Sequence, residues 1–325
     1  MIHARTRTAD GSIVDNASAE QLHALLEDPD CLTWLDLETP TPEEVGLVGG
    51  IVHWEHLTVE DLIGQGQRAK LERFEGYDLL VMHTLTYESP ADGSPARLGT
   101  PEVDFVIGKN YVATVHYTHI PHLTDTRDIA EHVGRLLKDG PDYILYVLTD
   151  KLVDGYFPTL DLMHDAVDEL EDRIVTDPSD KLLPVIFAMK RDAVVMRKAI
   201  SPQLEVFSRL TSPGYGIVSA EHSNYFRDVH DHLIRVFESA DSYRELMGGA
   251  LDAYLSTVSN RMNEVMKRLT VMAALFLPIT FFTGVFGMNL RETPLWKDSI
   301  FWVFLGGMFA VSAVQYWYFK RKSWV

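Results

Sequence analysis

The chain has 325 residues, of which 47 are Asp or Glu and 29 are Lys or Arg, so its formal net charge is -18. So negative a chain argues against nucleic acid as its main partner, because the phosphate backbone would repel it. Such acidity is typical of a well-solvated surface, and a second interpretation is the attraction of cations to a cytosolic domain.

The first part of the chain alternates strand and helix signals. Leu32–Leu37 is an apolar run typical of a strand, and Thr41-Pro42-Glu43-Glu44 has the capping Thr, early Pro and first-turn acids of a helix start. Thr58-Val59-Glu60-Asp61 resembles a second helix start. We predict a cytosolic α/β domain over residues 1–142 with a mixed or antiparallel sheet. Its other strands are expected at Leu79–Tyr87, Glu102–Ile107 and, after a Gly108-Lys109-Asn110 turn, Tyr111–Tyr117.

From Tyr143 the pattern becomes helical. Tyr143–Val175 has apolar residues at helical spacing and ends before Asp177-Pro178, and Lys181–Leu210 predicts a second helix. After a turn at 212–216, a third helix is expected to run from about Ala220 to Asn289, a length that requires packing. We predict that residues 143–267 form a helical stalk region. The acids from Asp161 to Asp172 indicate a solvated face, or a surface that attracts cations.

Two uncharged runs follow the stalk and predict a transmembrane hairpin within 268–325. The first run, Leu269–Leu290, and the second, Ser299–Phe319, are each long enough to cross a hydrocarbon core of roughly 30 Å, with helices expected at about 269–289 and 299–319. Lys and Arg residues flank the two ends of the hairpin, whereas its short connection carries no net charge. By the positive-inside rule, both termini are cytoplasmic.

The first run carries a stripe of small and weakly polar residues at helical spacing. Steps of three and four place these residues on one helix face, whereas Phe276, Phe281, Phe282 and Phe286 occupy other faces. One interpretation is close helix–helix packing. The other is a water-lined path in which Met266 and Leu277 are narrow apolar points. The stripe consists of Asn263, Met266, Thr270, Ala273, Leu277, Thr280, Gly284 and Gly287.

The sequence lacks a catalytic constellation, so we expect no enzyme activity. It has no glycine-rich phosphate loop and one cysteine, Cys31, which suits a reducing cytosol, and we expect neither an organic cofactor nor a nucleotide. His230 and His232 are two residues apart and do not share a helix face, so a zinc site made by them alone is not expected. Solvated or capping roles are expected for these two and for His222.

The end of the first uncharged run carries the motif Gly287-Met288-Asn289, which resembles the signature of the CorA family of divalent-cation (magnesium/cobalt) transporters. Two further stretches support the resemblance. Tyr225 to Leu233 (YFRDVHDHL) is similar to a family stretch, and so is the Trp34-Leu35-Asp36-Leu37 strand with the Pro and acids after it. The remaining residues in phase with the family pattern are Tyr254, Ser256, Asn260, Asn263, Met266, Leu269, Thr270, Phe276, Pro278, Thr280 and Gly284.

The resemblance implies a homopentameric funnel in which the first membrane helix of each subunit surrounds a central axis. Gly287, Met288 and Asn289 would form the selectivity filter, and the stripe would line the pore. The family also implies a long stalk, whose apolar positions Val229, Leu233, Val236 and Phe237 are expected to be buried. The Lys320, Arg321 and Lys322 run is an anchor at the inner surface, and a second interpretation is a basic collar around the pore.

The resemblance further implies a regulatory Mg²⁺ site between subunits. In the family an Asp in the stalk pairs with an acid of the α/β domain, and the matching residues here are Asp228 and Glu88. The family residue expected at position 88 is Asp, so Glu88 is a longer substitute. The alternatives for Asp228 are an ion pair with Arg227 or Arg235, or a plain surface acid. The connection departs from the family's Met-Pro-Glu, because Thr293-Pro294-Leu295 stands there, and this leaves ion preference open.

These observations predict a multi-pass inner-membrane channel for passive influx of hydrated Mg²⁺, with Co²⁺ and Ni²⁺ as further ions. Cytosolic Mg²⁺ would gate it, so Mg²⁺ is both the transported and the regulatory ion. Its partners are other copies of itself, the lipid bilayer and divalent cations, and not nucleic acid. The alternatives are a Zn²⁺ transporter of the same fold and a membrane-anchored cytosolic sensor without a pore.

Overall fold

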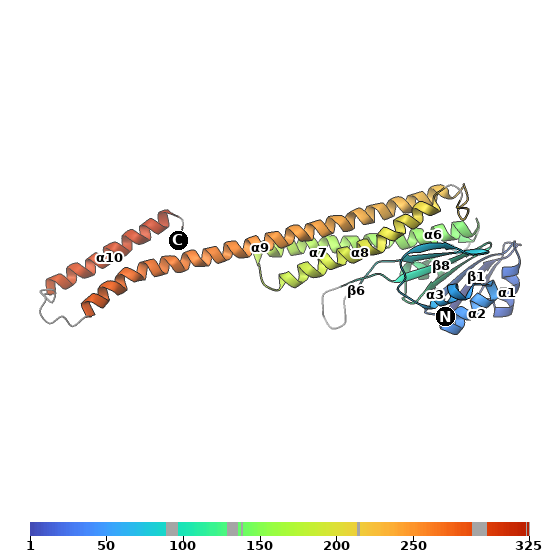
Figure 1. The fold of residues 1–325 in the computed structure, drawn as a ribbon, viewed down its shortest axis with the longest axis horizontal. Helices are drawn as coiled ribbons and strands as arrows, with labels where there is room; N and C mark the ends of the chain where they lie inside the picture. Colours follow the sequence, from blue (N-terminus) through green and yellow to red (C-terminus); the bar gives the residue numbers. More distant parts are fainter. Residues whose placement is uncertain are drawn as a thin grey trace. The chain divides into compact units, whose positions relative to one another are not determined.

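The computed structural model describes residues 1–88, 97–128, 136–137, 139–212, 215–287, 298–322 and 324 (Figure 1). The chain forms two compact units. The first contains Met1–Arg173 and Ser179–Ala250, and the second contains Ile174–Pro178 and Leu251–Val325. The predicted boundaries at residues 142 and 267 stay predictions.

A seven-stranded mixed sheet forms the centre of the first unit, in the order β2-β1-β3-β9-β8-β5-β4. The central pair β3–β9 is parallel, with Thr33 opposite Tyr111, and the other neighbouring pairs are antiparallel. The mixed sheet predicted from the sequence is therefore confirmed. The strands are β1 (Ile2–Arg7), β2 (Ile13–Asp15), β3 (Leu32–Glu38), β4 (Lys70–Arg73), β5 (Tyr77–His83), β8 (Glu102–Gly108) and β9 (Tyr111–His116).

Helices cover both faces of this sheet, which explains why its central strands are almost continuously apolar. On one face Leu35, Leu79 and Val106 pack with residues of α1 (Ala19–Glu27), α2 (Pro42–Val52) and α3 (His56–Ile63). Contacts with β8 and β9 come from α6 (Pro141–Asp154), and contacts with β4 and β5 come from α8 (Leu182–Leu210). A short helix, α4 (Pro121–Asp128), follows β9 and contacts α6.

The structure corrects three element predictions. The expected strand Leu79–Tyr87 divides after His83, and β6 (Thr86–Glu88) pairs instead with β7 (Arg97–Gly99) in a separate two-stranded sheet. The helix predicted to start near Thr58 starts at His56, and the Thr58 hydroxyl lies 2.8 Å from the Tyr77 hydroxyl.

The third correction concerns the expected helix Tyr143–Val175, which is two helices, α6 and α7 (Tyr156–Thr176), separated at Gly155. A Cβ at this position would lie 2.5 Å from His122 Nε2 and 3.2 Å from the Leu152 carbonyl oxygen, so any larger residue would require the His122 side chain to move. Tyr156 begins α7 fully buried. Its hydroxyl donates to the His83 carbonyl, and the Gln203 side-chain oxygen lies 3.1 Å from the same hydroxyl oxygen.

The helical predictions that follow agree with the structure. Helix α8 begins one residue after Lys181 and ends at Leu210 as expected, and α9 extends unbroken from Ser223 to Gly287. Val229, Leu233 and Val236 of α9 are completely buried, as predicted, and Phe237 is half-buried beneath the Arg197 guanidinium. The last helix is α10 (Asp298–Arg321). The predicted turn at 212–216 lies partly outside the described residues.

Candidate functional site

Helix α9 carries the first predicted membrane segment. Within the described residues, Ser223–Val285 is the one helix that is long and apolar enough to cross a membrane. Only 6 % of its most apolar window is buried, which distinguishes it from the core helix of a soluble protein. Helix α10 coincides with the second predicted segment, but its crossing of the membrane stays a prediction.

The stripe predicted from the sequence is exposed along α9. All eight stripe residues, from Asn263 to Gly287, are exposed, and Leu277 has 70 % of its surface exposed. In contrast, Val271 is buried, and the half-buried Phe282 ring packs edge-on against Phe304 of α10 with centroids 5.2 Å apart. The small and polar residues therefore do not serve the contact between α9 and α10. The packing interpretation of the stripe would require a second copy of the chain.

The hydroxyls of the two threonines in the stripe donate hydrogen bonds within the helix. The Thr270 hydroxyl donates to the Met266 carbonyl at 2.7 Å, and the Thr280 hydroxyl donates to the Phe276 carbonyl at 2.9 Å. Because each hydroxyl hydrogen is used inside the helix, only oxygen lone pairs remain to face outward. A surface of acceptors suits the waters around a cation, since these waters turn their hydrogens away from the ion.

The predicted filter lies at the end of α9. Gly287 is the last residue of the helix and is exposed. Met288 and Asn289 lie outside the described residues, and so does the connection through Lys297. The role of the Gly-Met-Asn motif therefore stays a prediction from the sequence.

The predicted basic collar lies at the end of α10. Lys320, Arg321 and Lys322 are all exposed, and the Arg321 guanidinium lies over the Trp317 ring, 5.4 Å from its centroid. Trp324 stacks on Phe319 and borders a hollow of about 600 Å³ that stripe residues of α9 also line. The collar residues thus end the helix with an accessible positive charge.

A cluster of possible metal ligands lies between α6 and α9 in the first unit. Asp150 and Asp154 of α6 and His232 of α9 each offer a ligand atom, and these atoms lie within 4.8 Å of one another. The His232 Nδ1 atom is buried without a hydrogen-bond partner among the described residues, although Asp154 lies 3.8 Å away. We call these three residues the α6–α9 cluster. Two carboxylates and an imidazole with an orphaned nitrogen fit a divalent cation.

Asp228 lies beside this cluster. Its carboxylate is 65 % exposed and lies 3.8 Å from His232 Nε2, so the alternative ion pair with Arg227 or Arg235 is not the observed one. Burial raises the pKa of Asp150, and the neighbouring negative charges of Asp154 and Asp228 raise it further. Three acids that repel one another around a half-buried position would gain stability from a bound cation.

The proposed partner of Asp228, Glu88, ends strand β6, and its side chain lies outside the described residues. Sequence reasoning did not identify Asp150 or Asp154 as possible ligands. Asp150 and Asp154 are four residues apart on one helix, and Asp228 and His232 are four apart on another, so each pair shares a helix face. That spacing was a usable signal, but the sequence does not show that α6 and α9 are neighbours.

The prediction of solvated or capping histidines is wrong for His222. This residue is buried, and its Nδ1 lies 2.9 Å from the Asp142 carboxylate. Burial opposes ionisation of Asp142, but hydrogen bonds from the Ser219 backbone and from His222 hold its pKa below the usual range. His230 is not a member of the α6–α9 cluster.

Comparisons with known proteins agree on one family. Residues 30–321 match the family model described as CorA-like Mg²⁺ transporter protein. The chain is 35 % identical to the cobalt/magnesium transport protein CorA of Thermotoga maritima, over 90 % of this chain and 83 % of that protein. It is 24 % identical to the zinc transport protein ZntB of Yersinia pseudotuberculosis, over 90 % of this chain and 88 % of that protein. The complete structure of the CorA magnesium transporter of Methanocaldococcus jannaschii has the same fold, with a TM-score of 0.83 at 19 % identity, covering 100 % of this chain and 99 % of that one.

Proposed function

The chain belongs to the CorA-like Mg²⁺ transporter family, whose members move divalent cations across membranes, and we propose that it is a channel for passive influx of hydrated Mg²⁺. The observation that carries this proposal is the exposed stripe of acceptors on α9. In a homopentamer, five copies of this stripe would surround one axis and form a path lined by hydroxyl and amide oxygens, with narrow apolar points at Met266 and Leu277. The collar residues and both termini would then lie on the cytoplasmic side of the inner membrane.

The chemistry of the stripe favours an ion that keeps its water. Mg²⁺ loses water reluctantly, and the stripe offers hydroxyl and amide oxygens but no carboxylate, thiol or imidazole. Neutral acceptors can hold the outer hydrogens of a hydrated ion without trapping it, which conduction requires. Asn289 at the end of the helix would complete this series as the filter.

Zn²⁺ is the second candidate ion. The similarity to a zinc transport protein supports it, and so does the imidazole in the α6–α9 cluster, since nitrogen ligands suit Zn²⁺ and Co²⁺ better than Mg²⁺. The stripe itself supplies no such ligand, and we therefore keep Mg²⁺ as the transported ion.

We further propose that cytosolic divalent cations regulate the channel from the acidic surface of α6 and α9. The α6–α9 cluster and Asp228 supply repelling acids that a cation would neutralise, with Glu88 of another subunit as an additional ligand. Because α9 extends without a break to Gly287, binding near Asp228 acts on the same helix that carries the stripe. A cation with higher affinity for the closed arrangement would shift the population towards it.

Uptake of Mg²⁺, Co²⁺ and Zn²⁺ into liposomes containing the purified protein tests the transport proposal. Thr270→Val removes one acceptor per subunit, and so five around the pore of a homopentamer, at nearly constant volume. It should lower Mg²⁺ flux at least about fivefold, the equivalent of about 1 kcal/mol for the loss of a single hydrogen bond. Thr283→Val is the matched control, because its hydroxyl also bonds to the preceding turn but lies beside the stripe. Equal effects of the two variants would contradict a pore lined by the stripe, and flux of Zn²⁺ alone would favour the second candidate.

A further inference from the structure

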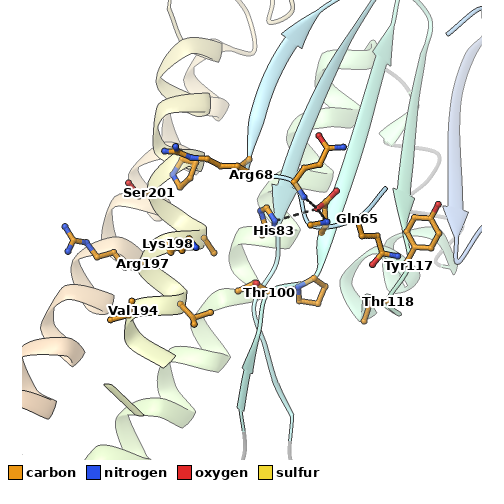
Figure 2. A pocket seen from close by; sticks show the side chains of 18 residues that line it. Gln65, Arg68, His83, Thr100, Tyr117, Thr118, Val194, Arg197, Lys198 and Ser201 are labelled. Carbon is orange, nitrogen blue, oxygen red and sulfur yellow. Dashed lines mark hydrogen bonds and ion pairs between the residues drawn. The ribbon is translucent and has the colours of Figure 1, made fainter. Parts of the chain in front are cut away.

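A cavity in the first unit lies away from the stripe and from the α6–α9 cluster. It has a volume of about 1100 Å³ and lies between the ends of β4, β5 and β8 and the middle of α8 (Figure 2). This volume is slightly above the range for sites that bind small organic molecules, about 300–1,000 Å³. Most of its lining is apolar, including Pro101, Val194, Val195 and Pro202. Such walls suit a flat organic body better than a bare ion.

The floor of the cavity carries an incompletely bonded carboxylate. The Glu102 side chain is 9 % exposed, and its Oε2 atom accepts hydrogen bonds from the backbone amides of Gly66 at 2.8 Å and Gln67 at 2.7 Å. Its Oε1 atom is buried and has no partner among the described residues. His83 lies 3.9 Å from this carboxylate, beyond hydrogen-bond distance. A buried acceptor without a donor is costly, so a ligand that donates one hydrogen bond would be stabilised here.

The rim of the cavity is basic. Arg68 extends from the sheet towards Ser201 of α8, and Lys198 lies one turn earlier on the same helix (Figure 2). Arg197 is turned away from the sheet and forms an ion pair with Asp241 at 3.3 Å, so its charge is already compensated and it is not counted as a ligand of the anion. No described acid forms an ion pair with Arg68 or Lys198. These two cations are placed to bind an anion at the mouth of the cavity.

We propose that this cavity binds a nucleoside phosphate, with its phosphates on Arg68 and Lys198 and a base amino group donating to Glu102 Oε1. The apolar walls would hold the base, and the distribution of charge matches a molecule that is anionic at one end and a donor at the other. This proposal revises the expectation of no nucleotide, which was based on the absence of a glycine-rich phosphate loop. Here the phosphate contacts come from Arg68 and Lys198, which lie far apart in the sequence and therefore form no continuous motif.

Calorimetric titration of the full-length protein in detergent with ADP tests this proposal, with inorganic pyrophosphate as the comparison probe. We expect one ADP per subunit, and pyrophosphate at least about tenfold weaker, because it lacks the base. Arg68→Gln and Lys198→Gln should each weaken ADP binding about tenfold, since each removes a charge-assisted hydrogen bond. Arg191→Gln, an exposed cation on the same helix outside the cavity, should leave it unchanged.

A second variant tests the floor of the cavity independently of the rim. Glu102→Leu removes the acceptor and should bring ADP binding close to that of pyrophosphate. Glu102→Gln should have a similar effect, because its one oxygen would stay with the amides of Gly66 and Gln67 and its amino group, a donor, would take the place of Oε1. Absence of ADP binding by the wild-type protein would overturn the proposal. It would equally be overturned if pyrophosphate bound as tightly as ADP, or if the rim variants bound ADP as well as the Arg191→Gln control.

Discussion

Replacement of Asp150 by Asn should change the stability of the protein in opposite directions with and without divalent cations. Asp150, Asp154 and His232 place their ligand atoms within 4.8 Å of one another. Two carboxylates at that distance repel by ~3.5 kcal/mol at an effective dielectric constant of ~20 and by ~0.9 kcal/mol in water. The Asp154 side chain is 44 % exposed, so solvent and salt screen the pair and a value of about 1 kcal/mol is expected.

The raised pKa of Asp150 determines whether Asp150→Asn stabilises or destabilises the metal-free protein. A carboxyl whose pKa is raised by folding is less stable in its charged form when folded, so the ionised Asp150 lowers stability at neutral pH. Asp150→Asn removes the charge at constant shape, and without metal the variant should therefore be more stable by about 1 kcal/mol. A cation at 100 times its dissociation constant adds about 2.7 kcal/mol to the wild-type protein, and most of this gain should be lost in the variant.

Thermal unfolding in EDTA and in millimolar Mg²⁺, Co²⁺ or Zn²⁺ measures both effects. Asp165→Asn is the matched control, because Asp165 is an exposed acid of α7 outside the cluster. It should change neither the stability in EDTA nor the stabilisation by added cations. If Asp150→Asn destabilised the metal-free protein, the argument from repulsion would be refuted. If cations stabilised the variant as much as the wild-type protein, Asp150 would not be a ligand.

The other predictions concern the stability of the first unit. Burial opposes ionisation of Asp36, but hydrogen bonds from His116 and Thr114 and the charge of Arg127 lower the pKa of Asp36. Burial likewise favours the neutral form of His116, but the hydrogen bond to Asp36 raises the pKa of His116. The Asp36 contribution is lost as pH falls from 3.8 through its folded pKa, and the His116 contribution is lost as pH rises above 6.5 through its folded pKa. Melting temperatures measured across pH should show both losses of stability. Asp36→Asn should flatten this dependence of melting temperature on pH and lower the free energy of unfolding by about 3 kcal/mol. An unchanged pH dependence in the variant would contradict the role of this pair. Leu233→Ala should lower the free energy of unfolding, measured with denaturant, by about 3 kcal/mol because the Leu233 side chain is completely buried. The control Leu162→Ala should lower it by less than about 0.5 kcal/mol because Leu162 is 52 % exposed. Similar losses in the two variants would contradict the packing of α9.

Local signals in the sequence were reliable where one segment contains all the interacting groups. The Thr41 hydroxyl accepts a hydrogen bond from the Glu44 backbone amide, and the Glu44 carboxylate accepts one from the Thr41 backbone amide. Helix α2 therefore starts where this capping motif places it. The start of α3 was missed because Glu55 provides no side-chain cap, and Thr58 looked like a cap although its hydroxyl serves Tyr77.

Predictions failed where the deciding contact comes from a distant segment. At Gly155, where α6 and α7 separate, a Cβ would meet His122 of α4, and β5 ends where its pairing with β8 stops. For the same reason the α6–α9 cluster and the cavity beside Glu102 were not predicted, because each joins residues that are far apart in the chain. The stripe could be recognised in the sequence because its residues share one helix. The structure shows these residues exposed, and their role as a pore lining stays a prediction.

The most direct measurement is Mg²⁺ uptake into liposomes by the wild-type protein and by Asn289→Ala, with light scattering to establish that both assemble equally. The proposal predicts uptake down the Mg²⁺ gradient by the wild-type protein and loss of most of that flux in the variant. Equal uptake by both proteins would contradict the role of Asn289 as the filter. Absence of flux for every divalent cation in the assembled wild-type protein would contradict the channel itself and would favour the membrane-anchored sensor.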